Sequence, residues 1–315
     1  MPYLEKNLKE RIEAKLNQMQ KLRPLSVASV RKLREQFALE MTYNSNAIEG
    51  NKLTLKETFL VINEGLTIKG KSLKDHLEAK DHYDALNYLY EQIEYGGRHT
   101  VSEVFIRNIH RLIVKETESE EVGKYRTSNV VIAGSDHNPP EASGVPFLMR
   151  DLLKWVQKNK NKIHPIELSA VLHHKLVFIH PFFDGNGRTA RLVMNLVLMQ
   201  KGYPLVVVLK NDRKKYYQTL ALADKGDYRP FVRFIAQAVE RSMNIYLKTL
   251  IPSKAAREEY LPLSEISRQT PYSEKYLNLL ARFGKIEAHK EKRNWLTTLG
   301  AVERYIKNRK RKTKK

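Results

Sequence analysis

The chain has 315 residues, 42% of them hydrophobic and 29% charged, which excludes a fully disordered or fibrous protein. It contains no cysteine, so disulfides, thiolate metal sites and cysteine nucleophiles are excluded, and no apolar run is long enough to span a membrane. A formal charge of +21 favours polyanionic partners such as a nucleotide, a nucleic acid or an acidic protein. Because the N-terminus has no signal-peptide pattern either, we expect a cytoplasmic protein without a membrane partner.

Apolar residues recur at spacings of three and four through most of the first 250 residues, which predicts an all-α architecture. We place domain boundaries at 1–100, an N-terminal helical region; 101–250, a helical core; 251–305, a separate C-terminal module; and 306–315, a basic tail. The predicted helices cover 4–22, 27–46, 54–65, 73–94, 102–116, 145–160, 165–179, 187–201, 212–223 and 228–248.

Two segments interrupt or end these helices. Ser45 to Gly50 (SNAIEG) is, taken alone, a helix end with Gly50 as its cap. Residues 123–140 (GKYRTSNVVIAGSDHNPP), here called the flap, hold a short β-branched run followed by turn residues. This composition predicts a small hairpin or extended segment inserted between helices.

The segment His180 to Arg191 (HPFFDGNGRTAR) is a tight loop that feeds the N-terminus of a buried helix. Gly185 and Gly187 let the backbone turn sharply and approach a ligand, and the first unpaired N–H groups of the helix favour a phosphate. Arg188 and Arg191 lie three residues apart, on one helix face, where both can reach phosphate oxygens.

Two further groups in this segment have chemical uses. Asp184 supplies a hard oxygen ligand, and Mg²⁺ is commonly held by one or two carboxylates together with substrate phosphates. His180 stands at the mouth of the loop with a pKa range suited to a general base. Each element alone has a structural alternative: a helix stop at the His-Pro pair and a simple turn at Gly-Asn-Gly.

The sequence of the C-terminal module predicts a winged helix-turn-helix. We expect two short helices at 264–268 and 273–283, the second with Ser273 as N-cap and Gly284 as C-terminal cap. We expect the two strands of a wing at 285–289 and 294–297. Residues 251–315 hold 17 basic and 7 acidic side chains. The module could therefore bind DNA through 273–283, the wing and the tail, or could equally bind protein.

Together, the residues of 180–191 resemble the motif of the Fic (filamentation induced by cAMP) family, His-x-Phe-x-Asp/Glu-Gly-Asn-Gly-Arg-x-x-Arg, with every fixed position matched. The resemblance implies a helical core that transfers AMP from ATP to a Ser, Thr or Tyr hydroxyl of a target protein or of itself. It makes His180 the base and Asp184 the Mg²⁺ ligand. The ATP-binding residues it implies are Gly185, Asn186, Gly187, Arg188, Thr189, Ala190 and Arg191.

The resemblance extends to two other segments. In the family a hairpin beside the nucleotide docks the target, which makes Ile132, Ala133 and Gly134 its contacts here. The segment 211–220 occupies the place where the family closes over the nucleotide base, with Tyr216 as the contact or, alternatively, as a packed core residue.

Ser45 to Gly50 matches the family's inhibitory motif Ser/Thr-x-x-x-Glu-Gly/Asn. The resemblance implies that Ser45, Glu49 and Gly50 form an intramolecular brake in which Glu49 pairs with Arg191 and takes the cation that the γ-phosphate needs. In some relatives the same glutamate supports AMP removal, and the sequence does not choose between these roles. Three alternatives stay open: a DNA-binding regulator that uses the Fic core as a nucleotide sensor, transfer of a group other than AMP, and a homo-oligomer of unknown size.

Overall fold

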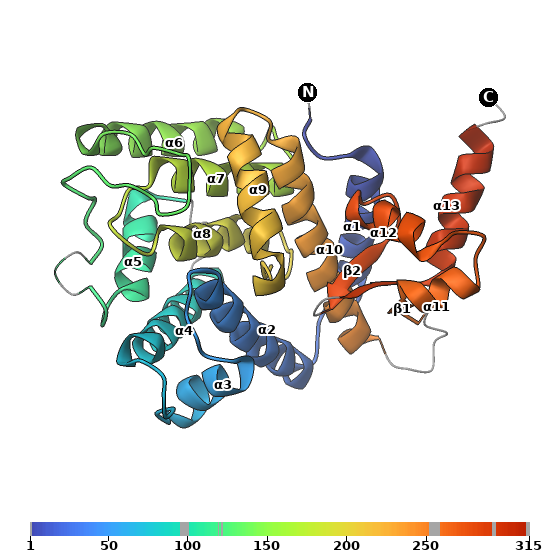
Figure 1. The fold of residues 1–315 in the computed structure, drawn as a ribbon, viewed down its shortest axis with the longest axis horizontal. Helices are drawn as coiled ribbons and strands as arrows, with labels where there is room; N and C mark the ends of the chain where they lie inside the picture. The colour runs from blue at the N-terminus through green and yellow to red at the C-terminus, as the bar shows by residue number, and fades with distance from the viewer. Residues whose placement is uncertain are drawn as a thin grey trace. The chain divides into compact units, whose positions relative to one another are not determined.

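The computed structural model describes residues 2–94, 101–118, 120, 122–251, 259–291 and 294–312, with side chains described as far as Arg309. The described chain is mostly helical and divides into two compact units, which comprise residues 2–3 with 31–235 and residues 4–30 with 236–312 (Figure 1). None of the described helices is long and apolar enough to cross a membrane.

The first unit confirms the predicted all-α core, with helix ends shifted by a few residues at most. Its helices are α2 (Val27–Ile48), α3 (Leu55–Glu64), α4 (Leu73–Glu94), α5 (Glu103–Ile113), α6 (Val145–Asn159), α7 (Pro165–Ile179), α8 (Asn186–Gln200), α9 (Arg213–Asp224) and the first turns of α10 (Arg229–Leu250), with short 3₁₀ turns at Ala142–Gly144 and Lys210–Asp212.

Helix α8 is the centre of this unit. It packs against α7, α5 and α4, and almost every one of its side chains is buried. Burial on all sides explains why the sequence of α8 is apolar around most of its circumference. The loop before α8 is therefore held between two buried helices, because α7 ends where that loop begins.

The flap is extended, as one of the two sequence alternatives states, and turns at Ile132 to Ser135, where Gly134 has a φ of 74°. No β-ladder joins its arms within the described residues. Backbone carbonyls at Ser128 and Pro140 instead accept hydrogen bonds from the side chain of Arg126.

The second unit contains α1 (Lys6–Lys21), the rest of α10, α11 (Leu263–Arg268), α12 (Glu274–Arg282), α13 (Leu299–Lys312) and three strands. The strands β1 (Leu261–Pro262), β2 (Ala288–Glu291) and β3 (Asn294–Thr297) form an antiparallel sheet in the order β1-β3-β2. Two short helices followed by a hairpin is the order that the predicted module requires. The core beneath them is formed by Leu263, Ile266, Leu277, Leu280, Ala281, Ile286, Ala288 and Val302.

The unit boundaries differ from those placed on the sequence. Helix α1 joins the C-terminal residues, because Arg11 donates from Nε and Nη2 to the carboxylate of the buried Glu240 at 2.8 and 3.0 Å and from Nη1 to the Gly284 carbonyl at 3.1 Å. The basic tail also differs, since α13 continues to Lys312. Residues 252–258, at the start of the predicted C-terminal module, and the wing residues Lys292 and Arg293 lie outside the described residues.

Candidate active site

The loop between α7 and α8 begins at His180, whose backbone is left-handed. His180 has φ 50° and ψ 60°, the one positive φ of a non-glycine residue in the described chain, and its N–H caps α7 at the Leu176 carbonyl. Such a conformation is unfavourable for an L residue and tends to persist where surrounding contacts enforce it. The backbone conformation therefore fixes the direction in which the side chain of His180 leaves the chain.

The rest of the loop is anchored by an aromatic stack and an amide. Phe182 is fully buried and lies flat on His110, with ring centroids 3.7 Å apart. His110 also bonds through Nε2 to the Asp184 carbonyl at 3.1 Å. The Asn186 side chain bonds both backbone groups of Phe182, at 2.8 and 2.9 Å, so it braces the loop.

The N-terminus of α8 has the features of an anion site. Gly185 is left-handed, with φ 73°, and precedes the helix, whose first N–H groups have no intrahelical acceptor. Arg188 and Arg191 project from its first two turns and are each 1% exposed. Arg188 is neutralised by Asp184, at 3.1 Å, and by Glu78 of α4, at 3.4 Å.

Glu49 lies within this anion site. Its Oε1 is 2.6 Å from Nη2 of Arg191 and lies so close to Gly187 that any larger side chain at that position would collide with it. Arg191 also donates two hydrogen bonds to Ser45, from Nε to the hydroxyl and from Nη2 to the backbone carbonyl, both at 2.9 Å. The three predicted segments 45–50, 185–187 and 188–191 thus converge, although 142 positions separate Glu49 from Arg191.

The charges of the site are strongly coupled. Burial by itself lowers the pKa of the Arg191 guanidinium, but the Glu49 carboxylate raises it above its usual range. Burial, reinforced by the nearby Arg126, lowers the pKa of His180 to about 4, and Glu49 opposes this weakly. His180 is consequently neutral at pH 7 and able to accept a proton.

Asp184 fits the predicted Mg²⁺ ligand in its chemistry. Burial raises the pKa of its carboxyl, yet Arg188 and the Gly185 N–H outweigh this and hold the pKa below its usual range. The side chain is 44% exposed, and its two oxygens accept from the Gly185 N–H at 2.6 Å and from Arg188 at 3.1 Å. No group of three or more acidic, His or Cys ligands occurs within the described residues, which leaves Asp184 as a single carboxylate that would need phosphate oxygens beside it.

The remaining predicted residues lie as follows. Tyr216 is buried, and its hydroxyl lies 3.0 Å from His173 and 3.5 Å from Arg191. It therefore lies where the second of the two alternatives, a packed core residue, places it. Thr189 and Ala190 are buried in the first turn of α8, Gly50 caps α2 at φ 107°, and Ile132 to Gly134 form the turn of the flap.

Four residues of this region were missed on the sequence: Glu78, His110, Arg126 and Tyr217. Tyr217 lies next to Tyr216 but is 38% exposed, and its hydroxyl is 3.4 Å from Oε2 of Glu49. Because adjacent residues of a helix point in different directions, the sequence could have indicated that only one of these two tyrosines is packed in the core. For Glu78, His110 and Arg126, no local sequence pattern indicates a contact with a distant part of the chain.

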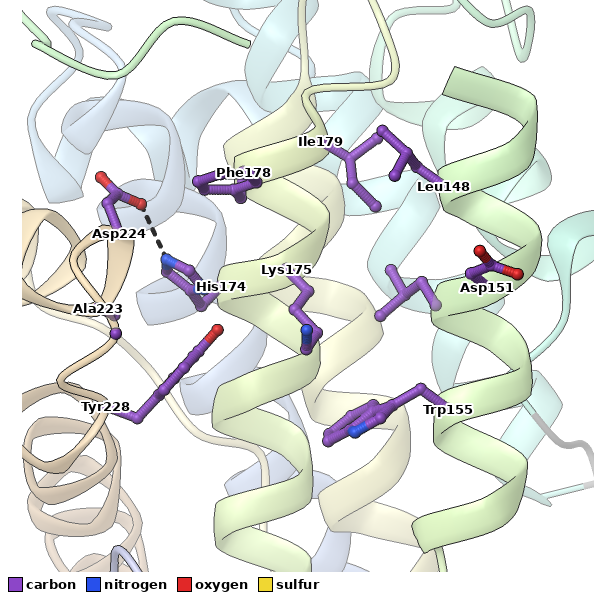
Figure 2. A pocket seen from close by; sticks show the side chains of 12 residues that line it. Leu148, Asp151, Trp155, His174, Lys175, Phe178, Ile179, Ala223, Asp224 and Tyr228 are labelled. Atoms are coloured by element: carbon purple, nitrogen blue, oxygen red, sulfur yellow. Dashed lines mark hydrogen bonds and ion pairs between the residues drawn. The ribbon is translucent and has the colours of Figure 1, made fainter. Parts of the chain in front are cut away.

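A cavity of about 450 Å³ opens beside α7 (Figure 2). Trp155, Phe178 and Tyr228 supply aromatic walls, and a 2.8 Å contact joins His174 to Asp224. None of the predicted site residues lines it, although Ile179 at its edge directly precedes His180.

Comparisons with known proteins agree with this geometry. The Fic/DOC family model matches residues 100–198. The chain is 37% identical over 246 residues to a protein adenylyltransferase Fic of Nematostella vectensis, covering 78% of this chain and 56% of that protein. Among solved structures, a Fic domain containing signaling protein of Bacteroides thetaiotaomicron is 32% identical with a TM-score of 0.71, covering 78% of this chain and 96% of that one.

The chain therefore belongs to the Fic family. A Fic family protein of Desulfovibrio desulfuricans, 24% identical with a TM-score of 0.63, covers 95% of this chain and shares its fold. The chain spans about half the length of the curated relatives that it matches, 56% and 44% for two of them.

Proposed function

We propose that this protein is a protein adenylyltransferase that transfers AMP from ATP to a hydroxyl side chain and is held inactive by Glu49. The observation that carries the proposal is the Glu49 carboxylate seated against Gly187 and Arg191, in the anion site at the N-terminus of α8. A site built for phosphate but filled by a carboxylate of the same chain is a ready basis for a brake.

In the transfer, neutral His180 accepts the proton of the target hydroxyl, and the freed oxygen attacks the α-phosphorus. A new O–P bond forms, the bond to the bridging oxygen of the β-phosphate breaks, and pyrophosphate leaves with the electron pair. Arg188 and Arg191 hold the β- and γ-phosphates, and the N–H groups of Gly185 and Gly187 face the developing charge. Mg²⁺, when bound at Asp184, supplies charge neutralisation to the phosphates.

Glu49 blocks this arrangement by charge and by volume. While it occupies Arg191, the γ-phosphate loses its cation, and the α-phosphate is left out of line with the attacking oxygen. The same carboxylate could instead direct water for AMP removal, so Glu49 has two proposed uses that share one position.

The test uses ATP labelled at the α- or the γ-phosphate, with native protein, Glu49→Gly and His180→Ala. We expect α-label to become protein-bound, at least about 10-fold faster in Glu49→Gly, because one aligned phosphate contact is worth that much in rate. His180→Ala should abolish it. Glu64→Gly, at the exposed end of α3, is the matched control and should behave as native.

Three outcomes contradict parts of the proposal. Label from the γ-phosphate would indicate a kinase-like orientation of ATP. Equal rates for native and Glu49→Gly would exclude the brake, and release of AMP from labelled protein by native but not by Glu49→Gly protein would favour the removal role.

A further inference from the structure

The buried guanidinium of Arg126 joins both arms of the flap to the loop between α7 and α8, here called the catalytic loop. Arg126 is 2% exposed. Its Nε donates to the His180 carbonyl at 2.8 Å, its Nη1 to the Ser128 carbonyl at 3.0 Å, and its Nη2 to the Pro140 carbonyl. Ser128 and Pro140 flank the turn of the flap, so one side chain fixes both arms and the backbone of His180.

The backbone of Arg126 adds a fourth contact. Its N–H donates to the Pro181 carbonyl at 2.9 Å, so consecutive carbonyls of the catalytic loop are both bound by this residue. His180 lies at the centre of these contacts in its left-handed conformation. Because that conformation is unfavourable by itself, contacts on its own carbonyl and on the next one help to hold it.

His137 ties the far side of the flap turn separately. Its Nε2 is 2.7 Å from the Phe178 carbonyl, and its ring lies 4.1 Å from the Phe178 ring. Phe178 belongs to the last turn of α7, next to His180. Loss of the Arg126 contacts would therefore loosen the base of the flap while this second attachment persists.

The chemistry of Arg126 suits a clamp better than a charge pair. Every hydrogen bond that the structure describes for its guanidinium ends on a backbone carbonyl, and burial lowers its pKa. A planar fork of donors can serve three carbonyls in fixed directions, whereas a lysine ammonium keeps the charge without that geometry.

We propose that Arg126 is a positioning residue that holds the flap and His180 as one body, so that a target chain lying on the flap presents its hydroxyl to the imidazole. The inference rests on the proposed function. It adds that the distance between the docked target and the base is set by this side chain. A displacement of about 1 Å at this point would lower the transfer rate roughly 100-fold.

The experiment compares Arg126→Lys and Arg126→Met, each in the Glu49→Gly protein, with Lys124→Met as the matched control. Lys124 is an exposed cation two residues away on the same arm of the flap. Four quantities are measured: hydrogen exchange of the amides of 128–138, titration of the His180 imidazole by NMR, the rate of α-label transfer, and the dissociation constant of a non-hydrolysable ATP with Mg²⁺.

Arg126→Lys separates geometry from charge. We expect flap exchange roughly 10-fold faster and transfer roughly 100-fold slower than in the parent, with ATP analogue affinity within about threefold because the α8 site is untouched. The His180 pKa should stay low, since Lys keeps the charge. The other groups that face His180 are His137 and the Val177 carbonyl, because the parent protein has lost Glu49. In Arg126→Met the His180 pKa should rise toward its usual value.

Unchanged flap exchange and transfer in Arg126→Lys would overturn the inference, as would equal changes in Lys124→Met. If Arg126→Met does not fold, Arg126→Lys decides alone. If the Glu49→Gly parent transfers no label, the proposed function fails, but the exchange and titration data still show whether Arg126 joins the flap to His180.

Discussion

The two arginines of α8 differ in what neutralises them. Arg188 contacts Asp184 and Glu78, whereas Arg191 contacts Glu49 and the Ser45 backbone and hydroxyl. Glu78 is itself bound by the Asn51 side chain at 2.9 Å, so the partner of Arg188 is fixed from behind. Under the proposed function, a polyphosphate must therefore displace Glu49 to reach Arg191, whereas Arg188 is held by Glu78 independently of Glu49.

The pKa of His180 predicts the acid limb of the pH profile. A general base works only when neutral, and burial together with Arg126 places this pKa at about 4 instead of its usual 6.5. In the Glu49→Gly protein we expect kcat/KM for α-label transfer to be flat with respect to His180 from pH 8 to about pH 5 and to fall below it. A limb centred near 6.5 would contradict the buried, neutral base.

Individual residues were predictable where chemistry and spacing coincide within one segment. His180, Asp184, Arg188 and Arg191 belong to one twelve-residue motif, and the structure brings them together with Glu49. Arg126 was not predictable, because nothing in GKYRTS shows that a cation will be buried against carbonyls 14 and 54 positions away.

At the scale of elements, α12 shows how well caps mark a helix. Ser273 accepts from the Tyr276 N–H at 3.3 Å, and Gly284 has φ 64°, so both predicted ends are confirmed. The flap was harder, since β-branched residues that predict a ladder are also compatible with an extended segment held by side chains. What decides is the partner of each backbone group, which the local sequence does not specify.

The outer face of α12 bears on the DNA-binding alternative, which stays a prediction. Leu279 and Phe283, four residues apart, are each 46% exposed, and Glu274 lies in the first turn. A helix that enters the major groove uses polar and basic side chains, and an acidic first turn repels phosphate. Lys275 and Arg282 are exposed cations on this helix.

We therefore expect α12 not to contact DNA. Replacing Lys275 and Arg282 together by Ala should change duplex affinity less than about twofold and leave its salt dependence as in the control Lys69→Ala, an exposed cation of the first unit. Fluorescence anisotropy at several salt concentrations measures both. A salt slope reduced by about 2 would show that these cations meet phosphates and would restore the DNA-binding interpretation.

At the scale of the whole molecule, the two compact units do not follow the order of the chain, because long-range ion pairs join α1 to C-terminal residues. Arg11 and Glu240 are 229 positions apart, and Glu240 is 1% exposed. Periodicity locates α1 but cannot say which unit it joins, since that depends on one buried carboxylate finding its partner. The same contact makes α1 a structural part of the C-terminal unit.

Arg11→Met should destabilise the second unit by roughly 3 kcal/mol, because it leaves Glu240 buried without its bidentate partner. Trp295 lies in this unit and Trp155 in the other, so urea unfolding followed by Trp295 fluorescence in a Trp155→Phe background isolates the effect. Adding Glu240→Leu should recover much of the loss, and Lys6→Met, 87% exposed, should cost little. Equal losses for Lys6→Met and Arg11→Met would contradict this account.

The ion pair of Glu49 with Arg191 has a consequence for biosynthesis. The two residues are 142 positions apart, and synthesis runs from the N-terminus. The carboxylate has therefore left the ribosome long before the guanidinium is made, and the loop between them must close before either is paired. If Glu49 acts as the proposed brake, every nascent chain therefore carries this carboxylate before Arg191 is made, and the pair forms when the loop between them closes.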